Sequence, residues 1–324
     1  MKSKRKVLVW IIVLFVLFMG GIYTTLLLLG SHHNMHADRP NGKLGMMPIN
    51  GTPMFVTIAP GVNFKLDTGA DASSITTEDL AKLEALGFKA KESVYPVIGR
   101  NGLGNINYTF KRYSIDLPLY DYRFISDSLG KIHGEMIPES LNVLHNVDLV
   151  PSSTGFSVLG IDFLEKFKIE YRYDEHAVAF YFNMPDGYES FAKLNVSHNP
   201  IRDLWQSNRY YMVVRVQNIA NDYFLDTGLQ RVNIKLPSAE KTRTKRQLSC
   251  DTVHTMYSKY EAFVDYSSWV AIGDRAGSSH CWYYDNNEEP YSINPFNFLK
   301  QDFVIDFQNE EILLHPFSSA ISRR

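Results

Sequence analysis

Two short stretches of the sequence contain residues that could do chemistry together. The first is KLDTGADASSI, residues 65–75, and the second is FLDTGLQRVNI, residues 224–234. Each places an aspartate, Asp67 or Asp226, after an apolar run and directly before Thr-Gly. Two carboxylates about 3 Å apart do not both ionise readily, so such a pair holds one proton over a broad pH range. The ionised member can take a proton from water while the protonated member polarises a carbonyl, which is the chemistry of direct peptide-bond hydrolysis.

The residues around each aspartate indicate how it would be held. Glycine permits tight curvature and close approach of a neighbour, and the threonine hydroxyl can hydrogen-bond to a partner loop. The one basic residue close to either aspartate in sequence is Lys65, which we expect on the other face of its strand. No Ser-His or Cys-His constellation and no HExxH motif competes with the two aspartates. The sequence therefore predicts Asp67 and Asp226 as a catalytic pair.

A duplicated unit must position the two motifs, because their contexts match. MFVTIAPGVNFKLDTG from Met54 and MVVRVQNIANDYFLDTG from Met212 each predict an alternating strand, a turn and a second strand that ends at the aspartate. Residues 163–182 and 298–317 match as a short helix, a strand, an acidic turn and a closing strand. Two copies of one unit indicate two lobes. We expect them at residues 51–185 and 207–324, joined by a connection over residues 186–206.

These residues resemble a known family. LDTGADASSI resembles the active-site segment of retropepsin-like aspartic proteases, and SVLGIDFLEKF, residues 157–167, resembles their second signature. The whole chain looks like a single-chain, two-lobed aspartic protease similar in plan to pepsins. The resemblance implies a mostly β, bilobal fold of two pseudo-twofold-related, β-barrel-like lobes. It also implies catalytic aspartates at 67 and 226, a hydroxyl network from Thr68 and Thr227, loop-shaping Gly69 and Gly228, and a substrate contact from Asp71.

Two further elements fit this resemblance. Residues 76–88 predict a helix, with Thr76 and Asp79 as a capping box and Gly87 at the stop. VIGRNGLGNINYTF, residues 97–110, predicts a mobile hairpin whose Gly99, Gly102 and Gly104 would contact substrate as a flap. The second lobe has no glycine-rich counterpart, so we expect a single flap.

The second lobe departs from the family pattern at two places. Leu229 follows Asp-Thr-Gly where the family prefers a small residue, and Asn294-Pro295 stands where the first lobe has Gly160. Two functions therefore remain open. The first is a membrane-anchored aspartic endopeptidase that acts on a polypeptide as a monomeric catalytic unit. The alternative is an inactive pseudoprotease that binds peptides or a partner protein; a dimer that uses one lobe per chain is disfavoured because one chain supplies both motifs.

The N-terminus predicts a membrane anchor. Basic residues at positions 2, 4, 5 and 6 precede an uncharged run over residues 7–30, and about 20 apolar residues suffice to cross a bilayer. The positive-inside rule places residues 1–6 in the cytoplasm and exports the body to the periplasm or cell exterior. A signal peptide cleaved near Met35–Ala37 is the alternative, and residues 31–50 read as a linker.

Cysteine content and charge complete the expectations. Cys250 and Cys281 are the two cysteines, and in an exported protein we expect a disulfide between them, with two free thiols as the alternative. A net charge of −2 argues against a nucleic-acid partner. His32, His33 and His36 lack acidic or cysteine partners at ligand spacing, so we predict no metal site and no cofactor.

Overall fold

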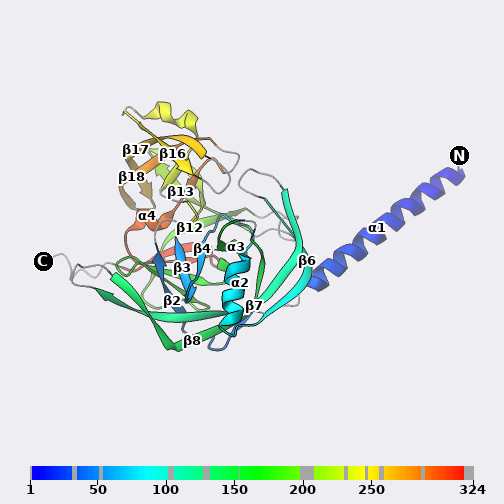
Figure 1. Ribbon diagram of the computed structural model, residues 1–324. Coiled ribbons are helices and arrows are strands. Elements are labelled where there is room, and N and C mark those ends of the chain that lie inside the picture. Colours follow the sequence, from blue (N-terminus) through cyan, green and yellow to red (C-terminus); the bar gives the residue numbers. More distant parts are fainter. Residues whose placement is uncertain are drawn as a thin grey trace.

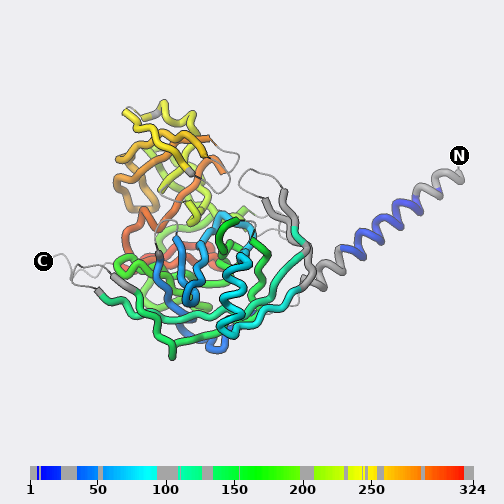
Figure 2. The backbone as a smooth tube through the Cα atoms, viewed as in Figure 1, coloured from blue at the N-terminus to red at the C-terminus, as the bar shows by residue number. Residues whose placement is uncertain are grey.

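The computed structural model describes residues 2–30, 35–50, 54–100, 106–126, 132–152, 154–197, 208–229, 233–244, 247–254, 259–285 and 289–316. Strands dominate these residues, and they form two lobes joined by a shared sheet (Figure 1). In Figure 2 the first lobe is blue to green and the second is yellow to orange, while the red C-terminal strands return to lie against the first. The chain thus has the mostly β, bilobal aspartic-proteinase fold that the sequence predicts.

Six antiparallel strands form the sheet that joins the lobes, in the order β2-β11-β10-β20-β21-β12. Their bounds are Lys43–Asn50, Ala177–Tyr181, Lys168–Arg172, Phe303–Asp306, Glu311–Leu314 and Glu189–Ser197 respectively. The two central strands, β10 and β20, come one from each half of the chain and pair from Lys168↔Asp306 to Tyr171↔Phe303. Every residue of β11 is buried, which fits its unbroken apolar sequence AVAFY.

The described part of the first lobe contains further strands and two helices. They are β3 (Phe55–Ala59), β4 (Val62–Leu66), β5 (Ser74–Ile75), α2 (Thr77–Ala85), β6 (Ala90–Arg100), β7 (Ile106–Ser126), β8 (Ile132–Pro151), β9 (Ser157–Leu159) and α3 (Ile161–Leu164). The predicted helix is confirmed at α2: the Thr76 hydroxyl accepts the Asp79 N–H at 3.1 Å. Gly87 follows the helix at a φ of +91°, a left-handed conformation that favours glycine.

The second lobe repeats this order. It contains β13 (Arg209–Val216), β14 (Ile219–Leu225), β15 (Ile234–Leu236), the 3₁₀ helix η1 (Ser238–Arg243), β16 (Ser249–His254), β17 (Lys259–Ile272), β18 (Arg275–Tyr283), β19 (Ser292–Ile293) and α4 (Pro295–Leu299). The pairings match as well: β4 lies parallel to β9, and β14 lies parallel to β19. In both lobes the next strand, β5 or β15, pairs antiparallel to that same partner.

A second hairpin lies at the equivalent place in the second lobe, and the expectation of a single flap stays a prediction. β6 pairs with β7 in the first lobe, and β16 pairs antiparallel with β17 at the equivalent place in the second. The second hairpin lacks the glycines of the first, so glycine content did not indicate it. Duplicated strand pairing, rather than local composition, determines that both hairpins form.

Part of the predicted linker and part of the predicted connection are strands. Within residues 31–50, His36–Ala37 forms strand β1 on β8, and β2 joins the central sheet with Leu44 and Met47 buried. Within residues 186–206, β12 pairs with both β21 and β13. These segments are the matching outer strands of the central sheet. Their Pro, Gly and polar residues resemble a loop because outer strands bury only part of their surface.

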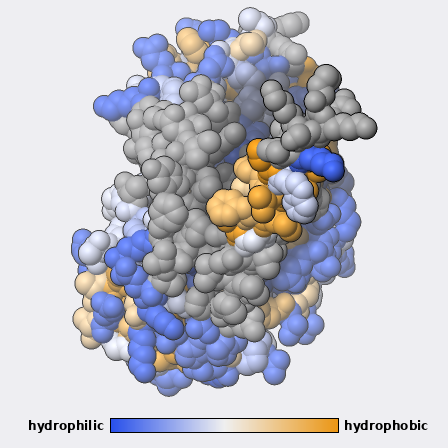
Figure 3. All heavy atoms as spheres, turned by 90° about the vertical axis from the view of Figure 1, so that its right-hand side faces the viewer, coloured by the Kyte–Doolittle hydropathy of each residue, from blue (hydrophilic) through white to orange (hydrophobic). Residues whose placement is uncertain are grey.

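The prediction of a membrane anchor is contradicted. Among the described helices, none is long and apolar enough to cross a membrane. The N-terminal helix α1 spans Lys2–Gly30. Its large apolar side chains are exposed and face the viewer in Figure 3. The predicted single-pass topology with an exported body is not retained.

The predicted disulfide is also wrong, because both cysteines are free. Cys250 lies on β16 opposite Phe263, and Cys281 lies on β18 opposite Asp265, so β17 runs between them. Two strand spacings amount to about 9–10 Å, whereas disulfide-bonded Cα atoms lie within about 7 Å. Burial raises the pKa of the Cys281 thiol to about 12.

Candidate active site

Two equivalent strands deliver the two Asp-Thr-Gly loops. β4 ends at Leu66 beside Leu159 of β9, and β14 ends at Leu225 beside Ile293 of β19. The pairing continues one residue further in each lobe. The Asp67 N–H donates to the Leu159 carbonyl at 3.0 Å, and the Asp226 N–H donates to the Ile293 carbonyl at 2.9 Å. Each aspartate is therefore fixed at the end of a buried parallel pair.

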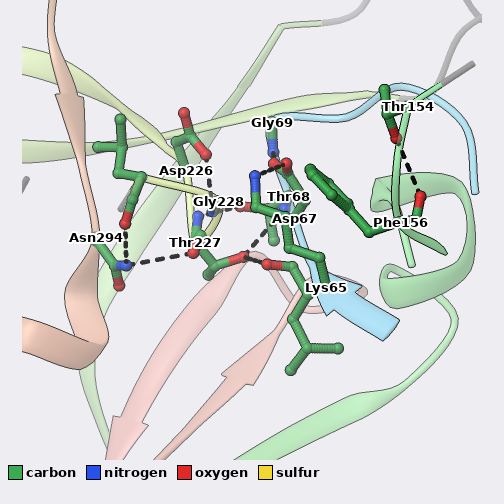
Figure 4. Close-up of polar contacts among 12 residues, drawn as sticks. Lys65, Asp67, Thr68, Gly69, Thr154, Phe156, Asp226, Thr227, Gly228 and Asn294 are labelled. Carbon is green, nitrogen blue, oxygen red and sulfur yellow. Dashed lines mark hydrogen bonds and ion pairs between the residues drawn. The ribbon is translucent and has the colours of Figure 1, made fainter. Parts of the chain in front are cut away.

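The two threonines join the loops to each other. The Thr68 N–H donates to the Thr227 hydroxyl and the Thr227 N–H donates to the Thr68 hydroxyl, both at 3.0 Å (Figure 4). The Thr68 hydroxyl in turn donates to the Leu225 carbonyl at 2.6 Å, and the Thr227 hydroxyl donates to the Leu66 carbonyl at 3.1 Å. Both threonines are buried. This closed set of four hydrogen bonds locks the lobes together beneath the aspartates.

The carboxylates lie against each other's loops. Asp67 accepts the Gly69 N–H at 3.0 Å, and Asp226 accepts the Gly228 N–H at 2.9 Å. A Cβ added to Gly69 would lie 2.8 Å from an Asp226 carboxylate oxygen, and one added to Gly228 would overlap the Asp67 carboxylate. Glycine is required at both positions because the opposite aspartate occupies the space. The structure thus brings Asp67 and Asp226 together across the lobe boundary.

Lys65 is the residue that the sequence reasoning misplaced. Its ammonium donates to Asp67 Oδ2 at 2.6 Å, and the side chains of Lys65 and Asp67 are 6% and 10% exposed. In an extended strand, residues i and i+2 share a face, so the two side chains point the same way. The ammonium also lies 5.9 Å from the centre of the Phe156 ring. The period of the strand alone could have indicated this contact.

Asp71 lies near a cation of the other lobe. Burial opposes the charge of Arg209, but the negative charges of Asp71 and Glu289 outweigh it and raise the Arg209 pKa. Arg209 begins β13, forms an ion pair with Glu289, and lies over the ring of Phe224 with its guanidinium carbon 5.3 Å from the ring centre. Asp71 therefore has an electrostatic partner across the lobe boundary, and its predicted contact with substrate remains untested.

The structure explains the departure at Asn294. In the first lobe, a Cβ on Gly160 would lie 2.7 Å from the Ala70 carbonyl oxygen, and the Ile161 N–H donates to that oxygen at 2.9 Å. Pro295 has no N–H to make the equivalent bond. Instead, the Asn294 side-chain amide donates to the Leu229 carbonyl at 3.2 Å and to the Thr227 carbonyl at 3.3 Å. A side chain thus supports the second loop where the backbone supports the first.

Leu229 has a packing reason of its own. It contacts a small apolar cluster of the second lobe, formed by Val253, Ala262, Val264, Trp282 and Tyr284. The first loop has Ala70 at the same place after Asp-Thr-Gly. The larger side chain of Leu229 therefore has a packing role in the second lobe.

The remaining predicted site residues are only partly placed. Gly99 pairs with Asn107 across the β6–β7 hairpin, whereas Gly102 and Gly104 lie outside the described residues. His36 stacks on the His145 ring, and His32 and His33 are not described. Among the described residues, no group of three His, Cys, Asp or Glu side chains could hold a metal ion.

Comparison with known proteins adds distant likenesses. The chain matches no family model and no curated relative. Among solved structures it is similar to Basic 7S globulin from soybean, at 10% identity and a TM-score of 0.42, over 87% of this chain and 95% of that one. It is also similar to the aspartic proteinase from Irpex lacteus, at 11% identity and a TM-score of 0.43, over 85% and 98%. The fold assignment rests on the strand pairing described above.

Proposed function

We propose that the chain is an aspartic endopeptidase in which Asp67 and Asp226 activate water for attack on a peptide carbonyl. The observation that carries this proposal is the reciprocal lock between the two loops, in which each carboxylate packs against the other loop's glycine. Because each loop leaves room for the carboxylate of the other, the arrangement supports the chemistry of a shared proton. One chain supplies both loops, so a monomer suffices.

The reaction follows from the two protonation states. The ionised carboxylate accepts a proton from water as the oxygen bonds to the carbonyl carbon, and the carboxylic acid donates to the carbonyl oxygen. Proton transfer to the nitrogen then lets the C–N bond break and releases a carboxyl and an amine terminus. No metal or cofactor takes part in these steps.

Digestion of a peptide library, read by mass spectrometry between about pH 3 and pH 7, tests the proposal. We expect cleavage by the wild type and none by Asp226→Asn. This variant is the cleaner one, since Asp67→Asn also leaves the Lys65 ammonium buried without its carboxylate. Asp222→Asn, on the same strand but exposed, is the matched control and should cleave normally. Absence of cleavage by folded wild type at every pH contradicts the proposal.

A second candidate is an inactive peptide- or protein-binding module with the same fold. The observation that favours it is the buried ion pair between Lys65 and Asp67, because a cation bound to the carboxylate weakens it as a base. This candidate predicts that wild type and Asp226→Asn bind the same peptides with similar affinity and cleave none of them. Isothermal titration calorimetry beside the digestion separates the two functions.

A further inference from the structure

A histidine and two aspartates fasten the N-terminal strand β1 to the first lobe. His145 on β8 lies between Asp116 on β7 and Asp38, the residue that directly follows β1. Its Nδ1 lies 2.9 Å from Asp116 Oδ1, and its Nε2 lies 3.0 Å from Asp38 Oδ1. Both nitrogens of the ring are therefore in hydrogen-bond contact with a carboxylate, and neither aspartate belongs to the candidate active site.

One protonation state of His145 satisfies both contacts. An ionised carboxylate only accepts hydrogen bonds, so each ring nitrogen must carry a proton to bind its aspartate. The neutral ring has a single N–H, which leaves the lone pair of its other nitrogen against a carboxylate. The imidazolium has two N–H groups and carries the charge opposite to that of both partners. In agreement, the hydrogen bonds to Asp116 and Asp38 outweigh burial and raise the pKa of His145.

Other titratable and charged side chains lie along the elements around His145. They are His36 on β1, Arg39 after it, Lys89 before β6, Arg112 on β7 and Asp148 on β8. His36 stacks on the His145 ring with 5.0 Å between centres, and Arg39 donates to backbone carbonyls of β8. Arg112 and Asp148 pair with each other, and Lys89 is exposed. The two aspartates are therefore the described groups that hydrogen-bond to the ring of His145.

The chain just beyond Asp38 is held without a titrating group. Asn142 of β8 is buried, accepts the Arg39 N–H at 2.9 Å and donates to the Arg39 carbonyl at 3.0 Å. It also donates to the Leu44 carbonyl at 3.2 Å. Because the amide of Asn142 keeps the same charge at every pH near neutrality, this anchor is constant. A change in pH therefore acts on the segment before Arg39, where the Asp38 N–H donates to the Val143 carbonyl at 3.0 Å.

We infer that His145 is a pH-sensitive latch, which fixes β1 to β8 in acid and loosens it above neutral pH. The sign follows from the raised pKa: the contribution of the latch is complete below about pH 6.5, the pKa of a free histidine, and is lost as pH rises through the folded value. Met35 and Ala37 pack against the core at either pH, so the latch changes how often the strand opens. The segment lies between α1 and β2, so the latch sets how firmly the N-terminal region is attached to the lobe. This inference goes beyond the proposed function and does not depend on it.

Hydrogen–deuterium exchange of the full chain, followed by mass spectrometry between about pH 5 and pH 9, tests the latch. Dividing each rate by the intrinsic rate at the same pH gives the protection of each segment. We expect protection over residues 36–38 to fall by about threefold or more as pH rises, the effect of a partly exposed ion pair. Protection over residues 44–47 of β2 should stay constant, because Asn142 holds that side of the segment. Constant protection over residues 36–38, or an equal loss over residues 44–47, overturns the inference.

Three variants identify the group that responds to pH. His145→Gln keeps a polar side chain and removes the charge, so protection over residues 36–38 should be low at every pH. His36→Phe keeps a stacked ring, removes the neighbouring histidine, and should retain the pH dependence of the wild type. His280→Gln, at an exposed histidine of β18, is the matched control and should leave it unchanged. If the pH dependence survives in His145→Gln or disappears in His36→Phe, His145 is not the latch.

Discussion

At the scale of single residues, Thr68 and Thr227 hold the two Asp-Thr-Gly loops in place against each other. Thr68→Val removes a hydroxyl that both accepts the Thr227 N–H and donates to the Leu225 carbonyl. Two buried groups then lose a partner, and each costs about 1–3 kcal/mol. We therefore expect the free energy of unfolding, measured by urea denaturation, to fall by about 2–4 kcal/mol. Thr68→Ser keeps the hydroxyl and should cost much less; equal losses for the two variants would contradict this account.

The two Asp-Thr-Gly loops could be predicted from sequence because their chemistry is local and written twice. Asp67, Thr68 and Gly69 recur as Asp226, Thr227 and Gly228 in matching contexts, and the structure brings the two sets together. The placement of Lys65 was predicted wrongly, because it was expected on the other face of the strand although residues two apart in a strand share a face. Arg209 is distant in sequence from Asp71, so that interaction could be found only from the folded chain.

At the scale of elements, the junction of β19 and α4 supports the second Asp-Thr-Gly loop although its sequence differs from that of the first lobe. Asn294 caps α4 by accepting the Phe296 N–H at 3.1 Å, and its amide donates to the carbonyls of Thr227 and Leu229. Asn294→Asp preserves the cap and removes both donations. We expect a loss of about 1–3 kcal/mol in urea unfolding, because a buried carboxylate then faces two carbonyls. If Asn294→Asp proves as stable as the wild type, the amide does not support the loop.

Gly160 offers the matching prediction in the first lobe. A methyl group there would lie 2.7 Å from the Ala70 carbonyl oxygen and 2.9 Å from the Ala72 carbonyl carbon, and neither backbone atom can move alone. We expect Gly160→Ala to destabilise the protein by about 1–3 kcal/mol and to lower any peptide cleavage, because the loop that carries Asp67 must shift. Gly155→Ala, where an added Cβ meets no atom within 4 Å, is the control. Thermal unfolding followed by circular dichroism compares the two.

Elements with a strong local signal were predicted better than elements defined by their partners. The helix α2 has a capping threonine, a leucine stripe and a terminal glycine, and it forms as expected. β2 and β12 resembled loops because neither alternates cleanly; each becomes a strand because β11 or β21 offers it an open edge. β16 was missed for the same reason, since it forms by pairing with β17.

At the scale of the whole molecule, two features hold the halves together. One is the set of hydrogen bonds between the Asp-Thr-Gly loops, and the other is the shared central sheet. β10 and β20 meet at the pseudo-twofold axis, and aromatic rings from both halves pack beside them: Tyr171 lies 4.6 Å from the Phe296 ring and 5.2 Å from the Phe303 ring, measured between centres. Duplication explains why one sequence pattern predicts both lobes. It does not predict which charged residues occupy the shared sheet, because those differ between the copies.

The ion pair between Lys168 and Asp306 joins the lobes within that sheet, and it should make stability depend on pH. Both side chains are buried, and burial opposes the charge of Asp306, but hydrogen bonds from Lys168 and Asn309 outweigh it and lower the Asp306 pKa. A lowered pKa adds stability above the pKa of the unfolded chain, about 3.9, and this stability is lost as pH falls through the folded value. We expect Lys168→Met to cost about 3 kcal/mol at pH 7, where it leaves a buried carboxylate without its cation, and less at pH 3.

Lys193→Met, which removes a largely exposed partner of Glu311, should cost under about 1 kcal/mol at either pH. Urea unfolding at both pH values measures all three proteins, and a cost for Lys168→Met that does not shrink in acid would show that the pair does not contribute through its charge.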